Sequence, residues 1–388
     1  MFKRRNRLNL TVRQCCFIAV GFLSFIALSL EANAFETIAR EAIVVEAETG
    51  AILLNKDADK LTPPSSMTKI MTTYMLFERL KSGAISLDDR FPVSEKAWRK
   101  GGSKMFVKVK DRVRVEDLIR GIVVQSGNDA CIVVAEGLAG DEAAFAAEMT
   151  QRGREIGLEK SVFKNASGWP EEGHLVTVRD LATLALRTIK DFPEYYHYYS
   201  EKQFTYNGIK QSNRNPLLFK GLGADGIKTG HTEVAGYGLV GSAERKGRRI
   251  IAVLNGLPSA KTRSTESARL VEWAFREFNN YALFKAGEEV ISADVWLGHK
   301  PRVPLLIEGD LKLTLPRKAR RGMKVSVKYE SPVPAPIRKG DRIATLVVSG
   351  KGIDSFEVQL VSGEEIERLG LVGRLGAALK FILWGASG

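Results

Sequence analysis

The sequence predicts an α+β fold in which helices pack on an antiparallel sheet, followed by a small all-β domain and a C-terminal amphipathic helix. Helical periodicities alternate with a few strands up to about residue 286, and short period-two runs replace them from there to residue 363. After residue 364, apolar side chains gather on one side of a helix. Because 388 residues can bury more than one core, we expect four segments, 1–34, 35–286, 287–363 and 364–388.

Residues 1–34 have the composition of an export signal. Five basic residues between Lys3 and Arg13 precede the uncharged apolar run 15–30, and Ala32-Asn33-Ala34 supplies the small residues of a cleavage site. A retained membrane anchor is the alternative, because the run is only slightly shorter than the roughly 20 residues that span a bilayer. The pattern predicts an exported protein that is cleaved after Ala34.

Cleavage would leave Cys131 as the single cysteine of the mature chain. One cysteine forms no internal disulfide, and Cys131 lies in the apolar run 130–134, which predicts a buried side chain and excludes a cysteine hydrolase. The formal net charge of +13 indicates a polyanionic partner. Export favours anionic lipid or an anionic wall polymer over nucleic acid.

The first domain begins with two short strands, 43–45 and 51–54, that form a hairpin. After Pro63-Pro64, apolar residues recur at helical intervals from Ser66 to about residue 80, so we expect Ser66 to start a helix. The remaining elements are helices at 115–121, 128–138, 141–156, 177–189 and 264–278, and strands at 226–230, 237–243 and 248–255.

Three short strings carry the chemistry: Ser66-Met67-Thr68-Lys69, Ser126-Gly127-Asn128 and Lys228-Thr229-Gly230. A serine hydroxyl needs a base within about 3 Å to become a nucleophile. Three residues along a helix bring Lys69 over the face that carries Ser66. Lys69 must then have a pKa below its usual value of about 10.4. Burial and a second cation both lower a lysine pKa, and we expect Lys228 to supply that cation.

The other residues of the strings have complementary roles. Ser126, placed before a helix, can relay a proton to a leaving amine, and Asn128 can hold Lys69 or the substrate amide. Free backbone N–H groups at Ser66 and His231 can stabilise an oxyanion. Each string also arises by chance, for example with Ser126 as a helix N-cap. Their order and local structure favour the serine acyl-enzyme site of penicillin-binding proteins and class A β-lactamases.

Residues 36 to about 278 resemble the low-molecular-mass penicillin-binding proteins that act as D-alanyl-D-alanine carboxypeptidases. The likeness extends to residues 102–106, 125–130, 213–215, 225–232 and 235–237. The resemblance implies a β-lactamase/transpeptidase-like domain that removes the terminal D-alanine from peptidoglycan stem pentapeptides and is acylated by β-lactam antibiotics. It implies that Ser66 forms the acyl-enzyme, that Lys69 is the general base, and that Ser126 and Asn128 belong to the proton relay.

The resemblance also implies a substrate-binding strand formed by Lys228, Thr229 and Gly230. A terminal carboxylate needs a cation, and Arg214 or Arg263, acting with Thr229, can bind it through two parallel hydrogen bonds. Surface salt bridges account equally well for both arginines. No histidine or carboxylate spacing indicates a metal site, and this chemistry needs no cofactor.

The C-terminal β segment resembles, more loosely, the domain that follows the catalytic domain in this family. Between Lys300 and Lys351 there are thirteen Lys or Arg and four Asp or Glu residues, which suits anionic lipid, wall polymer or a merely solvated surface. From Arg368 onward, a helix with one apolar side suits a membrane interface, and packing against the protein's own core is the alternative. Family members often end in such a helix. We therefore expect a periplasmic enzyme, anchored peripherally at the outer face of the cytoplasmic membrane.

The same sequence features are also compatible with three other functions. A DD-endopeptidase would use the same site and differ in how the groove admits a second peptide. A β-lactamase needs a carboxylate-activated water, and Glu171 and Glu172 do not match its usual pattern. A non-catalytic wall-associated module would use only the β domain and the terminal helix.

Overall fold

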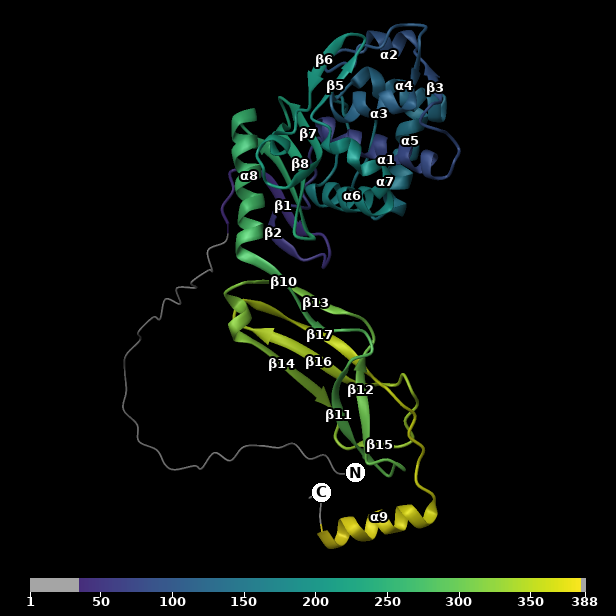
Figure 1. The fold of residues 1–388 in the computed structure, drawn as a ribbon, viewed down its shortest axis with the longest axis vertical. Helices are drawn as coiled ribbons and strands as arrows, with labels where there is room; N and C mark the ends of the chain where they lie inside the picture. The colour runs from purple at the N-terminus through teal and green to yellow at the C-terminus, as the bar shows by residue number, and fades with distance from the viewer. Residues whose placement is uncertain (1–34, 385–388) are drawn as a thin grey trace, which may run out of the picture. The chain divides into compact units, whose positions relative to one another are not determined.

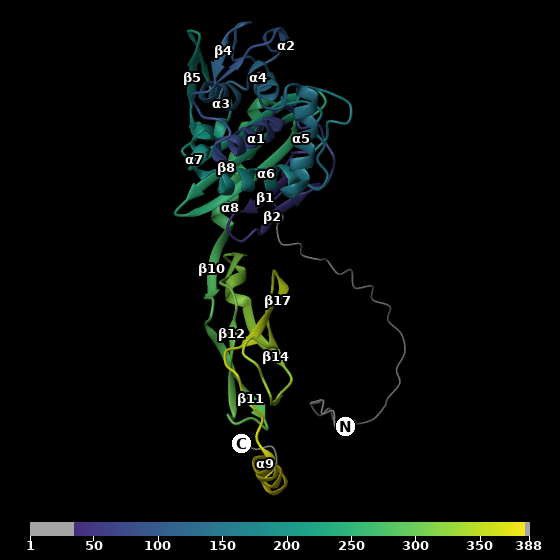
Figure 2. The ribbon, with the colours of Figure 1, turned by 90° about the vertical axis from the view of Figure 1, so that its right-hand side faces the viewer.

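The computed structural model describes residues 35–384 (Figures 1 and 2). Residues 1–34 and 385–388 lie outside the described residues, and so does the predicted export signal. Within the described part, most helices belong to the first domain and the C-terminal part is built mainly of strands. This arrangement confirms the predicted α+β class.

A five-stranded antiparallel sheet forms the centre of the first domain, in the order β2-β1-β9-β8-β7. Its strands are β1 (Glu41–Glu46), β2 (Ile52–Lys56), β7 (Ala224–Thr232), β8 (Gly236–Arg245) and β9 (Arg248–Leu257). The pairing confirms the hairpin predicted at β1 and β2 and the three later strands. Because β7 is an edge strand, one side of its backbone has no neighbour in the sheet.

Helices cover both faces of this sheet. Ala42 and Val44 of β1 pack in one core with Leu270 of α8 (Ala260–Glu277). Ile43 and Val45 point to the opposite face, because successive side chains of a strand alternate, and they join a second, larger core. Figure 1 shows α8 on one side of the sheet and α1 and α6 on the other.

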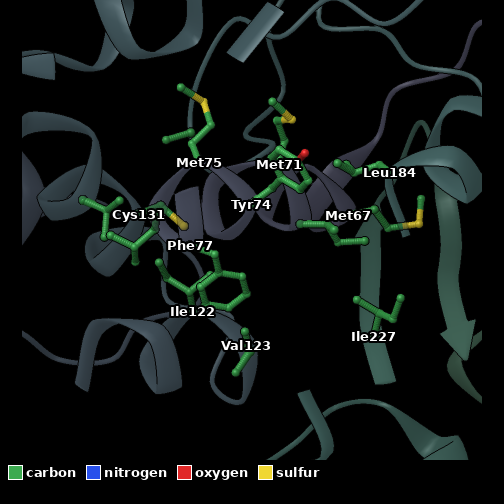
Figure 3. Close-up of a cluster of buried hydrophobic side chains, with 14 of the residues drawn as sticks. Met67, Met71, Tyr74, Met75, Phe77, Ile122, Val123, Cys131, Leu184 and Ile227 are labelled. Carbon is green, nitrogen blue, oxygen red and sulfur yellow. The ribbon is translucent and has the colours of Figure 1, made fainter. Parts of the chain in front are cut away.

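Helix α1 (Lys69–Lys81) is buried along most of its length in the second core. Apolar side chains of α1 and of the helices around it form one cluster (Figure 3). The helices around it are α3 (Val115–Val123), α4 (Asn128–Ala139), α5 (Glu142–Glu155) and α6 (Val178–Asp191). A 3-10 turn, η1 (Ser65–Thr68), precedes α1, so the helix predicted from Ser66 begins as a tighter turn. Cys131 lies in the cluster and burial raises its pKa to about 12, which confirms its predicted buried role.

The sequence analysis did not predict the short elements around the helical layer. They are β3 (Arg90–Pro92), β4 (Arg112–Arg114), β5 (Gln203–Tyr206), β6 (Ile209–Ser212), α2 (Glu95–Arg99), α7 (Pro193–Tyr196), η2 (His197–Ser200) and η3 (Pro216–Phe219). Runs this short do not show a periodicity. Helix α8 also begins earlier than the predicted residue 264, because Ser259 caps it by accepting the N–H of Thr262 at 3.0 Å.

The C-terminal domain is all β apart from one turn and the terminal helix. β10 (Phe278–Phe284) follows α8 directly and pairs with β13 (Leu311–Pro316). Six further strands form one sheet in the order β14-β16-β17-β12-β11-β15 (Figure 1). They are β11 (Glu289–Trp296), β12 (Arg302–Ile307), β14 (Met323–Tyr329), β15 (Val333–Pro334), β16 (Arg342–Gly350) and β17 (Ile353–Ser362). A 3-10 turn, η4 (Ala319–Gly322), links β13 to β14.

The last described element is helix α9 (Leu371–Trp384), which starts slightly after the predicted Arg368. Arg368 forms a β-bridge with Gly298, and the N–H of Leu369 donates to the carbonyl of Leu297 at 2.8 Å. The chain therefore leaves the β domain beside the end of β11. No helix among the described residues is both long and apolar enough to cross a bilayer.

Candidate active site

The Lys69 amine lies 2.9 Å from Ser66 Oγ and donates to it. In the 3-10 turn η1, side chains three residues apart lie almost directly above one another, which explains the short contact. Ser66 is partly exposed, whereas Lys69 is 1% exposed. The Ser66 hydroxyl is therefore accessible to a substrate, whereas the Lys69 amine is shielded from solvent.

Two further oxygens hold the Lys69 amine. Oδ1 of Asn128 accepts from it at 2.8 Å, and the carbonyl of Ser167 accepts at 2.6 Å. Burial, together with the charges of Arg214 and Lys100, lowers the pKa of Lys69 to about 8. With this pKa, about one amine in ten is neutral at pH 7, enough to serve as a base.

The Ser167 carbonyl is positioned by the loop before α6. Oδ1 of Asn165 accepts three backbone N–H groups, those of Ser167 at 3.2 Å, Gly168 at 2.8 Å and Trp169 at 3.0 Å. One amide side chain thus fixes the whole turn. The loop supplies Lys69 with an acceptor that none of the three strings contains.

Helix α4 begins at Asn128, so the second string lies at a helix start. Nδ2 of Asn128 donates to the carbonyl of Gly101 at 2.9 Å while its Oδ1 accepts from Lys69. Ser126 is buried, with a φ of 60°. Within the described chain, Asn128 contacts Lys69 directly, and the Ser126 hydroxyl forms no hydrogen bond with Ser66 or Lys69.

Strand β7 brings the third string against η1. A Cβ added at Gly230 would lie 3.1 Å from both the Pro64 carbonyl oxygen and Ser65 Cβ, so a glycine permits this approach. Thr232 Oγ1 lies 3.2 Å from Ser65 Oγ. Lys228 is 3% exposed and donates to the neighbouring backbone carbonyl at 3.1 Å. Lys228 is therefore buried on the strand that borders the turn of Ser66.

The two lysines of the site influence each other. Burial lowers the pKa of Lys228 well below its usual value, and the charge of Lys69 lowers it further. The expected effect of Lys228 on Lys69 stays a prediction, in keeping with this mutual interaction, and Arg214 and Lys100 are further cations whose charges lower the pKa of Lys69. The lysines therefore titrate as a pair.

Two arginines lie near enough to Lys228 for their charges to lower its pKa, and neither has an acidic partner among the described residues. Nη1 of Arg263 donates to the carbonyl of Gly230 at 3.3 Å, and its guanidinium lies over the Tyr237 ring at 5.6 Å. Arg214 donates to Ser103 Oγ. Burial lowers the pKa of each arginine. Both can supply the cation that a carboxylate needs.

The remaining predicted residues of β7 differ in exposure. Thr229 is 5% exposed and pairs with Leu239 of β8. His231 is exposed, and its ring stacks on Tyr237 with the centroids 3.8 Å apart. The imidazole therefore packs at the rim, and the backbone of His231 continues the edge of the strand past Gly230.

Comparison with known proteins agrees with this geometry. A family model described as D-alanyl-D-alanine carboxypeptidase matches residues 29–258, and one described as penicillin-binding protein 5, C-terminal domain, matches residues 278–368. The D-alanyl-D-alanine carboxypeptidase DacA of Escherichia coli is 36% identical over 345 residues, which cover 87% of this chain and 86% of that protein. The chain belongs to the D-alanyl-D-alanine carboxypeptidase family.

Solved structures from this family share both domains. The D-alanyl-D-alanine carboxypeptidase DacD from Francisella tularensis has a TM-score of 0.80 and 31% identity, over 87% of this chain and 95% of that chain. Penicillin-binding protein 5 from Haemophilus influenzae has a TM-score of 0.76 and 35% identity, over 86% of this chain and 98% of that chain. The carboxypeptidase fold thus extends over nearly all of the described residues.

Sequence reasoning missed Lys100, Ser167 and the close packing beside them in this carboxypeptidase. A Cβ added at Gly102 would lie 2.8 Å from Asn128 Nδ2 and 2.9 Å from the Trp169 ring. The glycine pair at 101–102 is the sequence feature that could have predicted this close packing against Asn128 and Trp169. Glycines at such positions mark a close approach of backbone to side chains.

Two other features lie outside the carboxypeptidase site. No cluster of His, Cys, Asp or Glu in the described residues is suited to hold a metal ion. A cavity of about 620 Å³ lies at the C-terminal end of α1, the end remote from Ser66. Its arginines are paired with acids, in the pairs Arg79–Glu148, Arg152–Glu78 and Arg187–Asp191. This pairing indicates a salt-bridged surface, and we assign the cavity no role in catalysis.

Proposed function

We propose that this protein is a serine-type D-alanyl-D-alanine carboxypeptidase that removes the terminal D-alanine from peptidoglycan stem pentapeptides. The observation that carries the proposal is the 2.9 Å contact between the Lys69 amine and Ser66 Oγ in a dry site where the pKa of Lys69 is about 8. A neutral amine at this distance removes the hydroxyl proton as the oxygen attacks. The activity named for the curated relative supports the same reaction.

Acylation joins Ser66 Oγ to the carbonyl carbon of the penultimate D-alanine while Lys69 takes the proton. The backbone N–H groups of Ser66 and His231 are our candidates for stabilising the oxyanion that forms. When this intermediate collapses, the peptide bond breaks. The Ser126 hydroxyl does not hydrogen-bond Lys69 in the free site, so in this proposal it relays the proton from Lys69 to the leaving amine of the terminal D-alanine only once the substrate is bound, and the amine of Lys69 is then neutral again.

The substrate lies along β7 in this proposal. An extended peptide can add to the free side of an edge strand through backbone hydrogen bonds. The terminal carboxylate then lies near Arg214, Arg263 and the hydroxyl of Thr229. Nε of Arg263 is buried and has no hydrogen-bond partner in the described structure.

Water completes the reaction. Lys69, neutral after the first product leaves, removes a proton from the water that attacks the ester, and Ser66 Oγ regains its proton as the ester bond breaks. Among the described residues, no carboxylate hydrogen-bonds Ser66 or Lys69, and Glu171 accepts instead from Asn165 Nδ2 at 2.9 Å. Without a carboxylate to activate water, an ester formed with a β-lactam should hydrolyse slowly.

We also propose that the enzyme works in the periplasm, with α9 lying in the plane of the outer face of the cytoplasmic membrane. Leu371, Val372 and Leu375 are 73%, 86% and 66% exposed, so the β domain does not cover the start of the helix. Interfacial helices bury such side chains at the boundary between lipid headgroups and acyl chains. The export pattern of residues 1–34 supports the same location.

Labelling with a fluorescent penicillin tests the site. The full-length protein should form a stable adduct on a peptide that contains Ser66 and should release D-alanine from diacetyl-L-Lys-D-Ala-D-Ala. The Ser66→Ala protein should do neither. Ser65→Ala is the matched control, because Ser65 is 2% exposed and pairs with Thr232, not with Lys69.

Other outcomes identify the alternatives. Rapid hydrolysis of a chromogenic cephalosporin without a stable adduct would indicate a β-lactamase. Faster cleavage of cross-linked dimers than of pentapeptides would indicate a DD-endopeptidase. A folded protein that forms no adduct and releases no D-alanine would be a wall-associated module.

A further inference from the structure

A group of exposed cations lies at one end of the β-domain sheet. The turn η4 and its flanking residues contribute Arg317, Lys318, Arg320, Arg321 and Lys324, and the turn after β16 contributes Lys351. All six residues are exposed. We call this set the η4 cluster.

Two segments of the chain meet to form the η4 cluster. Met323 pairs with Gly350 in the ladder between β14 and β16. A Cβ added at Gly350 would lie 2.6 Å from the carbonyl oxygen of Gly322, and one added at Gly352 would lie 4.0 Å from Ala319 Cβ. Because η4 lies against this turn, Lys351 is a neighbour of the other five cations.

No acidic side chain among the described residues forms an ion pair with the η4 cluster. Glu277 is close enough for charges of the cluster to act on it, and its carboxylate accepts from Arg276 at 2.8 Å. That hydrogen bond lowers the pKa of Glu277 first, and the charges of Lys318 and Arg317 lower it further. The carboxylate of Glu277 is therefore already paired outside the cluster.

Among the described residues, some cations elsewhere on the same domain are paired, whereas the exposed Arg338, Lys339 and Arg342 form no ion pair and serve below as the comparison. The ion pairs are Lys300–Glu364, Arg302–Asp294 and Lys328–Glu357. A solvated surface is expected to mix both signs of charge, as these pairs do. The η4 cluster differs in number, because six cations without an ion-pair partner in the described part of the chain lie together and create a local positive potential that attracts anions.

The η4 cluster lies at the end of the sheet opposite to the exit of α9. The ladder from Met323 to Tyr329 runs roughly 20 Å away from the cluster. The chain leaves toward α9 at the other end, where Arg368 bridges to Gly298. In contrast, the N–H of Arg317 donates to the carbonyl of Glu277, the last residue of α8, at 2.8 Å. The cluster thus borders the catalytic domain and not the segment proposed to lie on lipid.

We propose that the η4 cluster is a second binding site, separate from the Ser66 cleft, for the carboxylates of the peptidoglycan polymer. This inference rests on the proposed function, which makes that polymer the substrate. Each stem peptide ends in a carboxylate, and many stems along one strand form a polyanion. Single exposed charge pairs contribute little, so the attraction comes from several contacts made at once.

Sedimentation with purified, lipid-free peptidoglycan sacculi tests the proposal. The full-length chain carries Ser66→Ala so that it does not digest the sacculi. The test variant is K318Q/R320Q/R321Q/K324Q, and the matched control is K328Q/R338Q/K339Q/R342Q, which removes four exposed cations from the same domain. We expect sacculus binding to weaken at least about tenfold in the test variant and less than about twofold in the control. Added salt should weaken binding of the parent protein.

Two results would overturn the proposal. One is an equal loss of sacculus binding in both variants, which would indicate net charge instead of a site. The other is a test variant that binds sacculi normally but loses binding to phosphatidylglycerol vesicles, which would make the cluster a lipid site.

Release of D-alanine from the short peptide, measured with Ser66 intact, separates this proposal from the proposed function. Both quadruple variants should keep the parent rate, since the short peptide does not reach the cluster. A parent protein that releases no D-alanine would refute the proposed function, whereas the sedimentation result would still report on the η4 cluster alone.

Discussion

Gly168 lies directly against the backbone of Ser65. A Cβ added at Gly168 would stand 1.7 Å from the Ser65 carbonyl oxygen and 2.8 Å from Thr68 Oγ1. The φ of Gly168 is 78°, a conformation that residues with a side chain rarely adopt. This contact holds the loop that carries Ser167, and thus an acceptor of Lys69, against the turn that carries Ser66.

Gly168→Ala should therefore separate the loop from η1. We expect the rate of acylation by penicillin to fall at least about tenfold, because small misplacements of reacting groups are costly. The free energy of unfolding should fall by about 1–3 kcal/mol from overpacking and backbone strain. Stopped-flow acylation and urea unfolding measure the two effects.

Gly83→Ala is the control for backbone strain alone. The φ of Gly83 is 74°, and no atom lies within 4 Å of a Cβ added there. This variant should lose some stability and acylate at the parent rate. If Gly168→Ala acylates as fast as Gly83→Ala, the loop does not position the site.

The charge of Lys100 should influence acylation from outside the hydrogen-bonded site. Its amine lies 4.7 Å from the Trp169 ring centroid, and its charge lowers the pKa of Lys69. Because acylation in the proposed mechanism needs neutral Lys69, its rate should rise with pH through about 8 and then level off. Lys100→Gln should move this profile to higher pH and slow acylation at pH 7 by roughly two- to threefold.

Two control variants are needed to interpret this pH profile. Lys108→Gln removes an exposed lysine that does not act on Lys69, so its profile should match the parent. Lys69→Arg replaces the base by a cation that stays charged, and acylation should fall by at least about a hundredfold. A profile that does not depend on pH between about 6 and 9 would rule out Lys69 as the base.

His174 should make the fold sensitive to acid. Its Nε2 lies 3.1 Å from Thr68 Oγ1, and its pKa is lowered to about 4, mainly by burial. An unfolded histidine has a pKa of about 6.5, so between about pH 6.5 and 4 the unfolded chain binds more protons than the folded one. Stability is therefore lost as the pH falls through this window, by roughly 3 kcal/mol in total.

Urea unfolding at several pH values checks the role of His174. His174→Gln keeps a polar group near the position of Nε2 but does not titrate, so the loss of stability on acidification should shrink. His197→Gln, at an exposed histidine, should behave like the parent. An unchanged pH dependence in His174→Gln would mean that another group causes the acid sensitivity.

The sequence located those parts of the site that local patterns mark. Ser66 follows two prolines and opens a helical periodicity, and Lys228 lies in a strand between glycines. The Ser167 carbonyl has no such mark, because any residue type carries a backbone oxygen, and it reaches Lys69 across 98 residues of sequence. The effect of Arg214 on Lys69 likewise depends on distances that only the folded chain determines. Side chains whose residue type and local pattern mark them could thus be predicted from the sequence. A backbone carbonyl brought in from a distant loop, or a charge that acts across the folded chain, could not.

The apolar start of α9 should decide whether the enzyme stays on a membrane. The full-length variant L371S/V372S/L375S removes three exposed apolar side chains, each of which would gain about 1.5–3 kcal/mol when fully buried. Its binding to phosphatidylglycerol vesicles should weaken at least about tenfold, with an unchanged rate of D-alanine release from the short peptide. The matched control I209S/I291S/V325S changes three apolar residues that are exposed elsewhere and should bind vesicles like the parent. If N-terminal sequencing shows that residues 1–34 are absent and the α9 variant still fractionates with membranes, another part of the chain is the anchor.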